Sequence, residues 1–121
     1  MTLLRALFTV LLMCVSTAAF SGTVVSSNQL VPVGYCQLTS LSASVLLTSC
    51  SGGIPTTAQI IIAIPETQAV RWRDDSTAPT GSVGMPLAIG AALAYQGDLT
   101  KIQFIEQTAS AKLNVAFYRY Q

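Results

Sequence analysis

The chain has 121 residues, which suits one domain, since domains typically have about 100 to 150 residues. Only 9% of its side chains are charged, against a usual share of about 25%, and the net charge is +1. The few basic residues form no run, and this argues against nucleic-acid binding, which needs a basic stripe. Because so few charges keep copies apart, we expect a homo-oligomer, with a trimer as one candidate.

Residues 1–21 have the pattern of an export leader. Arg5 is followed by an apolar run at 6–15 and by a small-x-small cleavage pattern, Ala-Phe-Ser, at 19–21. The apolar run is shorter than the roughly 20 residues that a spanning helix needs, so no permanent membrane span is expected. Three alternatives stay open: a membrane anchor, lipidation at Cys14, and a retained apolar N-terminal arm.

Residues 22–30 are rich in Ser, Thr and Val without periodicity and are expected to form a flexible connector to a domain at 31–121. That domain alternates short apolar runs with turn residues, which predicts an all-β fold. A helix is expected nowhere in it except for one turn near 87–93, where Gly90 lowers the helix propensity. About seven short strands predict a single antiparallel β-sandwich or jelly-roll-like barrel. The expected strands are 31–38, 43–48, 57–64, 67–73, 91–96, 101–106 and 112–120.

Two strands have informative patterns. The segment 60–64, Ile-Ile-Ile-Ala-Ile, is apolar at every position and too short for an independent helix. A strand with two apolar faces is typical of a central strand that is covered on each side. In 112–120, Leu113, Val115 and Phe117 alternate with polar or small residues, which predicts one buried face and one wet face.

After the leader the chain contains two cysteines, Cys36 and Cys50. If the protein is exported, a disulfide between them would close a loop of about 15 residues and contribute about 3 kcal/mol in the chain-entropy picture. The alternative is a pair of reduced, buried thiols that act as small hydrophobic side chains.

The chain contains no histidine, so the commonest general base and the commonest metal ligand are missing. We therefore expect no catalytic residues, no metal site and no cofactor. Asp74 and Asp75 are adjacent, and adjacent strand residues point to opposite faces, whereas glycoside hydrolysis needs two facing carboxylates. We expect them to accept backbone N–H bonds in a turn. A hydrolase built on Asp74 or Asp75 is the remaining enzymatic alternative.

The segment around these aspartates has two interpretations. If the strand alternates, Trp72 points inward, and Arg71 and Arg73 point outward. The arginines and the following loop then form a contact patch for a carboxylate, a sugar acid or a partner protein. Alternatively the arginines are solvated or paired with nearby acids, at an ordinary strand edge. The candidate partner-contact residues, with two tyrosines from the last strand, are Arg71, Arg73, Asp74, Asp75, Thr77, Pro79, Tyr118 and Tyr120.

The segment 70–87 reads V-R-W-R-D-D-S-T-A-P-T-G-S-V-G-M-P-L. It resembles a segment of small virion structural proteins of tailed phages and prophages. This chain has Asp-Asp-Ser at 74–76 where that group is expected to have Asp-Asp-Gly, and Thr-Gly-Ser-Val at 80–83 where Thr-Ala-Ser-Val is expected. Shorter similar stretches lie at 33–35, 95–99, 102–105 and 111–115. The resemblance implies a non-enzymatic β-domain displayed on a particle as a symmetric oligomer, such as a capsid decoration or head fibre.

Two functions are therefore expected. A virion module would bind other capsid or tail proteins at the virion surface, retain its N-terminal arm and keep its cysteines reduced. An exported, prophage-derived binding module, periplasmic or extracellular, would lose its leader near Ser21 and form the bond between Cys36 and Cys50.

Overall fold

A computed structural model of the protein describes residues 29–121. The expected leader, Cys14 and residues 22–28 of the expected connector lie outside the described residues. The described chain forms eight strands and one short 3-10 helix. In chain order these are β1 (Leu30–Leu38), β2 (Val45–Leu46), η1 (Leu47–Ser49), β3 (Ile60–Pro65), β4 (Val70–Arg73), β5 (Met85–Leu87), β6 (Leu93–Tyr95), β7 (Gln103–Glu106) and β8 (Leu113–Tyr120).

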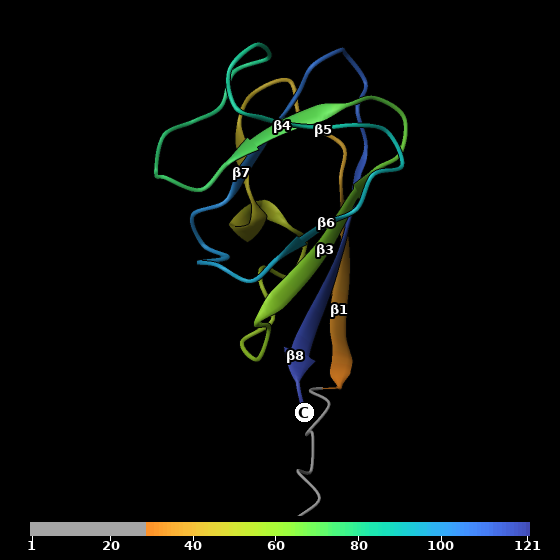
Figure 1. The fold of residues 1–121 in the computed structure, drawn as a ribbon, viewed down its shortest axis with the longest axis vertical. Coiled ribbons are helices and arrows are strands. Elements are labelled where there is room, and N and C mark those ends of the chain that lie inside the picture. Colours follow the sequence, from red (N-terminus) through yellow and green to blue (C-terminus); the bar gives the residue numbers. More distant parts are fainter. Residues whose placement is uncertain (1–28) are drawn as a thin grey trace, which may run out of the picture.

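The strands form two four-stranded antiparallel sheets that pack face to face, a first sheet in the order β1-β8-β3-β6 and a second sheet in the order β2-β7-β4-β5 (Figure 1). The strands pair from the two ends of the chain inward. The first strand, β1, pairs with the last, β8; then β2 pairs with β7, β3 with β6, and β4 with β5. Such nested pairing is a long antiparallel ribbon folded over on itself, which is the arrangement of an eight-stranded jelly roll. The expected all-β sandwich is confirmed, in its jelly-roll form.

The strands expected at 57–64, 67–73 and 101–106 begin two or three residues later than expected, and the other differences lie in the short elements. The helical turn considered at 87–93 is wrong: the chain there leaves β5, turns, and begins β6. In that turn the Ala91 N–H donates to the carbonyl oxygen of Ala88 over 3.0 Å, and Gly90 has φ of 75°. This left-handed conformation suits a tight turn and is incompatible with a helix. The strand expected at 43–48 ends early in η1, and β1 begins at Leu30, inside the expected connector.

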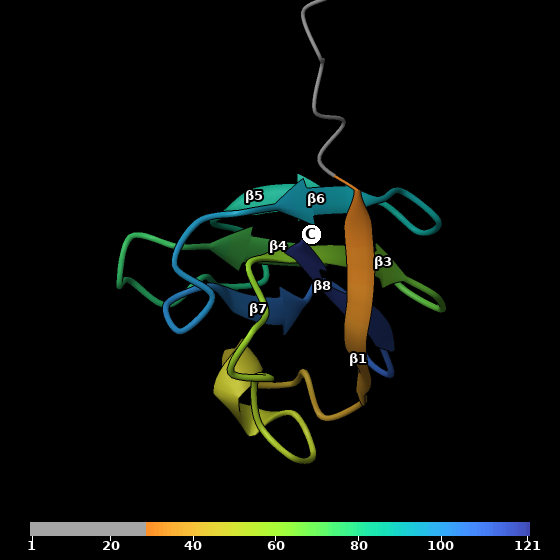
Figure 2. The same ribbon diagram turned by 90° about the horizontal axis from the view of Figure 1, so that it is seen from below.

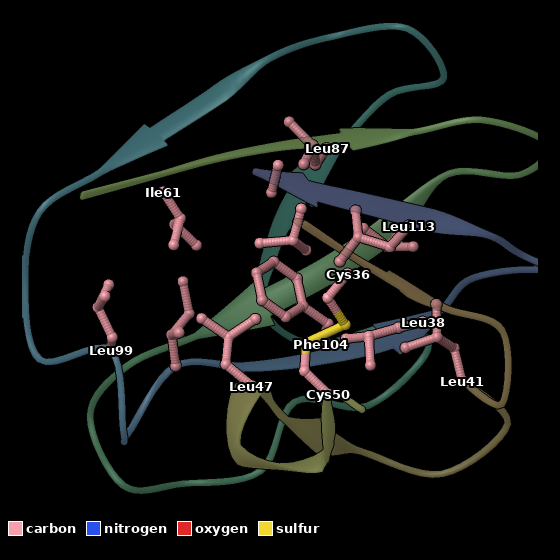
Figure 3. Packing of buried hydrophobic residues seen from close by; sticks show 14 of the residues in the cluster. Cys36, Leu38, Leu41, Leu47, Cys50, Ile61, Leu87, Leu99, Phe104 and Leu113 are labelled. Carbon is pink, nitrogen blue, oxygen red and sulfur yellow. A yellow bond between two sulfur atoms is a disulfide. The ribbon is translucent and has the colours of Figure 1, made fainter. Parts of the chain in front are cut away.

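The hydrophobic core lies between the two sheets. Leu113, Val115 and Phe117 of β8 are buried while the residues between them are half-buried, so the expected alternation is confirmed. Phe104 of β7 is fully buried in the same cluster, next to the labelled cysteine pair (Figure 3). Trp72 packs against this core, as expected, and contacts Tyr95 edge to face, with 5.9 Å between ring centroids. Trp72 belongs to β4 of the second sheet and Tyr95 to β6 of the first, so this contact joins the two sheets. The strands β5 and β6 lie along the same side of the sandwich (Figure 2).

β3 lies at the centre of the first sheet, between β8 and β6, as expected for its apolar sequence. Its Ile61 and Ala63 face the core and are fully buried. Ile62 and Ile64 are half-buried on the opposite face. Residues 29–121 form only the two sheets as layers, so within this part of the chain β3 is covered by a sheet on one face and not on the other.

Candidate functional site

Arg71 is bonded to its own loop. Its Nε donates to the carbonyl oxygen of Gly81 over 3.1 Å, and its Nη1 donates to that of Gly84 over 2.9 Å. Both acceptors belong to the loop at 74–84 between β4 and β5. Arg71 therefore fastens this loop to β4, and two of its guanidinium donors are used inside the chain.

Arg73 and Asp75 form an ion pair with two hydrogen bonds, one of which joins Nε to Oδ1 over 3.0 Å. Asp75 Oδ1 also accepts the Thr77 N–H over 3.2 Å, which is the turn role expected of this carboxylate. The hydrogen bond from Arg73 lowers the pKa of Asp75 below its usual range. A carboxylate held ionised in this way is a poor general acid.

Asp74 takes no part in the hydrogen bonds that Asp75 makes with Arg73 and Thr77. Burial raises the pKa of Tyr95 to about 12, and the nearby Asp74 carboxylate adds to the effect. The two adjacent carboxylates therefore lie in different surroundings, and this gives no support to a hydrolase built on the pair. Within residues 29–121, no three His, Cys, Asp or Glu side chains are grouped so that they could hold a metal ion.

The loop differs in one respect from the expected contact patch. Asp74, Asp75 and Thr77 are exposed, but Pro79 is buried. Pro79 is therefore wrong as a contact residue, because it packs inward. Beside the exposed residues lies an open hollow of about 280 Å³, lined by these aspartates and by Val83 and Met85.

Tyr118 and Tyr120 belong to a different surface. They lie on the face of the first sheet that points away from the core, whereas Arg71 and Arg73 lie on β4 of the second sheet. Both tyrosines are half-buried, and the Tyr120 hydroxyl donates to the side chain of Gln96 over 2.7 Å. The expected contact residues are thus divided between two surfaces.

The face that holds the two tyrosines carries no charged strand residue. We call it the outer face of the first sheet, and define it by the outward positions of the four strands. These are Leu30, Pro32, Tyr35, Gln37, Ile60, Ile62, Ile64, Ala94, Asn114, Ala116, Tyr118 and Tyr120.

One apolar row crosses all four strands of this outer face. Tyr35 of β1 is in register with Ala116 of β8, Ala116 with Ile62 of β3, and Ile62 with Ala94 of β6. Tyr35 is 64% exposed, the largest fraction among the exposed large hydrophobic side chains of residues 29–121. The row therefore presents a large ring at one sheet edge and small or medium side chains elsewhere.

A polar network fixes the ring of Tyr35. Its hydroxyl donates to Asn114 Oδ1 over 2.6 Å, and Gln37 Nε2 donates to the same oxygen over 2.9 Å. Glu66 Oε2, just beyond β3, accepts from Gln37 over 3.2 Å and from Asn114 over 3.1 Å. These side chains already form hydrogen bonds with one another. Covering them with a partner would therefore leave few polar groups without a hydrogen bond.

Four residues of the row were not predicted as contacts: Tyr35, Ile62, Ala94 and Ala116. The sequence pattern could have identified Ile62, because a strand that is apolar on both faces is expected to be covered on both faces. The other three could be found only from the register of β1, β8 and β6 against β3.

Cys36 of β1 and Cys50, which follows η1, form a disulfide, as one of the two alternatives predicted. Both residues are buried, with 6% and 4% of their surface exposed. The bond ties β1 to the segment that follows η1, within the hydrophobic core.

No protein-family model, curated protein or solved structure matches the chain. None of the helices formed by residues 29–121 is both long enough and apolar enough to cross a membrane. The fold and its surfaces define a jelly-roll domain with one charged loop, bonded to its own strand, and one sheet face whose strand positions carry no charge.

Proposed function

We propose that this protein is a non-enzymatic structural and binding module that docks on another protein chain through the outer face of its first sheet. One observation carries the proposal: Ile62 and Ile64 of the central strand β3 face outward, where no second layer of residues 29–121 covers them. Apolar faces of this kind mark interaction surfaces in soluble proteins.

The distribution of charge favours the first sheet over the second as the docking surface. Interface centres are depleted in charged residues and enriched in tyrosine. The outward strand positions of the first sheet include three tyrosines and no charge, whereas β4 of the second sheet carries Arg71 and Arg73.

The disulfide favours the exported form of the module. Bonds of this type persist in the periplasm and outside the cell and are rare in the cytosol. The chain would then act after its leader has been removed near Ser21, with Cys36 and Cys50 bonded.

A virion decoration or fibre module is the second candidate. Its support is the nested strand order, since eight-stranded jelly rolls recur in viral capsids, together with the low charge of the chain. The intact mass of the purified protein separates the two candidates. Loss of residues 1–21 and of two hydrogens supports the exported module, and a complete chain with all three cysteines as free thiols supports the virion module.

Docking itself is tested in a native extract of the cells that make the protein. We expect the protein to elute well above the mass of a single chain. Ile62→Glu should move it to the mass of a single chain. Ile105→Glu is the matched control, because Ile105 is a half-buried isoleucine on the outer side of β7, a central strand of the second sheet. An unchanged elution of the Ile62 variant would contradict the proposal.

A further inference from the structure

We infer that the occupant of the outer face is a second copy of this chain, packed face to face about a two-fold axis that runs parallel to the strands. This inference rests on the proposed docking function and names its partner. The argument comes from the order of side-chain sizes along the apolar row.

A two-fold axis parallel to the strands reverses the strand order in the facing sheet. β1 then lies opposite β6 of the second copy, and β8 lies opposite its β3. Positions along the strand direction are unchanged, so the apolar row of one copy lies opposite the apolar row of the other copy, in reversed order. Such a contact is isologous and closes after two copies.

Along the apolar row, this arrangement places large side chains opposite small ones. The exposed ring of Tyr35 lies over Ala94 of the partner subunit, and Ile62 lies over Ala116 of the partner subunit. Alternating large and small residues across facing layers lets them interdigitate. An axis perpendicular to the strands would instead place Tyr35 on itself and leave gaps between alanines.

The size of the face suits a weak, reversible dimer. Each strand residue covers about 16 Å² of sheet, from a rise of about 3.3 Å and a strand spacing of about 4.8 Å. The strands of the first sheet thus present roughly 400 Å² per chain, without the additional area of protruding side chains. Two such faces bury roughly 800 Å² in total, which is below the roughly 1,000 Å² of stable interfaces and within the range of weak, transient ones.

The sheet edges are poorer sites for a second copy. β2, β5 and β6 have only two or three residues each, and β5 carries Pro86 at its centre. β1 is long, but it contains Pro32 and an irregularity between Pro32 and Gly34. Short strands, proline and bulges all weaken edge pairing.

The first test is sedimentation of the purified full chain without other proteins. We expect a monomer at about 0.1 μM and a concentration-dependent shift to dimer by several hundred μM, as is typical of a weak, reversible interface. Ile62→Glu should weaken the dimer about 30-fold or more, as expected for a central interface residue. Ile105→Glu, the control on the second sheet, should leave the affinity unchanged.

The second test exchanges the large and the small residue. Tyr35→Ala leaves a hole opposite Ala94 of the partner subunit, and Ala94→Tyr places two tyrosines against each other. Each single change should weaken the dimer at least tenfold, and the double variant should recover to within about threefold of the original affinity. Circular dichroism of each variant confirms folding.

Several outcomes would overturn the inference. They are a purified chain that stays monomeric at several hundred μM, a trimer mass, or a double variant no tighter than the weaker single variant. A monomeric purified chain that still elutes at high mass from native extract, in a manner sensitive to Ile62→Glu, rejects the second copy and leaves the docking proposal standing.

Discussion

Reduction of the bond between Cys36 and Cys50 is expected to remove a large part of the stability of this domain. The two cysteines are 14 positions apart, so the bond closes a loop of about 15 residues in the unfolded chain. The chain-entropy relation gives about 3 kcal/mol for a loop of this length. Domains of this size have a total unfolding free energy of about 5 to 15 kcal/mol, so the loss matters.

The assay is thermal unfolding of the full chain with and without a thiol reductant, followed by circular dichroism. One kcal/mol corresponds to roughly 4 to 8 °C for a domain of this size, so the midpoint should fall by roughly 12 to 24 °C on reduction. The double variant Cys36→Ala, Cys50→Ala is the control, because the reductant should not shift its midpoint. Equal midpoints for the oxidised and reduced protein would refute the reasoning.

Further predictions concern the loop at 74–84 and the contact between the sheets. Arg71→Gln removes the donors to Gly81 and Gly84, so limited proteolysis within the loop should accelerate, by about tenfold if about 1.4 kcal/mol is lost; an unchanged cleavage rate would speak against this role. Gly84→Ala should destabilise the domain by about 1 to 3 kcal/mol in urea unfolding, because φ is 134° and a Cβ would lie 3.2 Å from the Trp72 carbonyl oxygen; a neutral effect would be inconsistent with that geometry. Burial raises the pKa of Tyr95 from 10.0 to about 12, so its contribution to stability is complete below about pH 10 and is lost as the pH rises through 12. Tyr95→Phe should flatten this fall, and an unaltered slope would contradict the assignment.

The regular strands could be predicted because their patterns are local. In β8 the alternation of Leu113, Val115 and Phe117 fixes the buried face wherever its neighbours lie. β5 could not be predicted, because it has only three residues with a central proline and exists through its pairing with β4. The region at 87–93 looked helical in part because alanine and leucine favour helix, but Gly90 fits the turn that the sheet pairing requires.

The candidate site depends still more on distant pairings. The role of Arg71 depends on two backbone carbonyls in the following loop, and no residue pattern identifies such acceptors. The row from Tyr35 to Ala94 exists only because four strands from separate parts of the chain are in one register. Of the residues in this row, only Ile62 could be predicted from the sequence, because it belongs to a strand that is apolar on both faces.

The most direct test of the central claim is hydroxyl-radical footprinting of the full chain, in its associated state and after dissociation by dilution. Tyr35 reports on the outer face of the first sheet, and Met85 and Ile89, which are 57% and 55% exposed, report on surfaces elsewhere. The account predicts that association slows the oxidation of Tyr35 severalfold and leaves the rates at Met85 and Ile89 unchanged. Equal oxidation of Tyr35 in both states, with protection at Met85 instead, would contradict it.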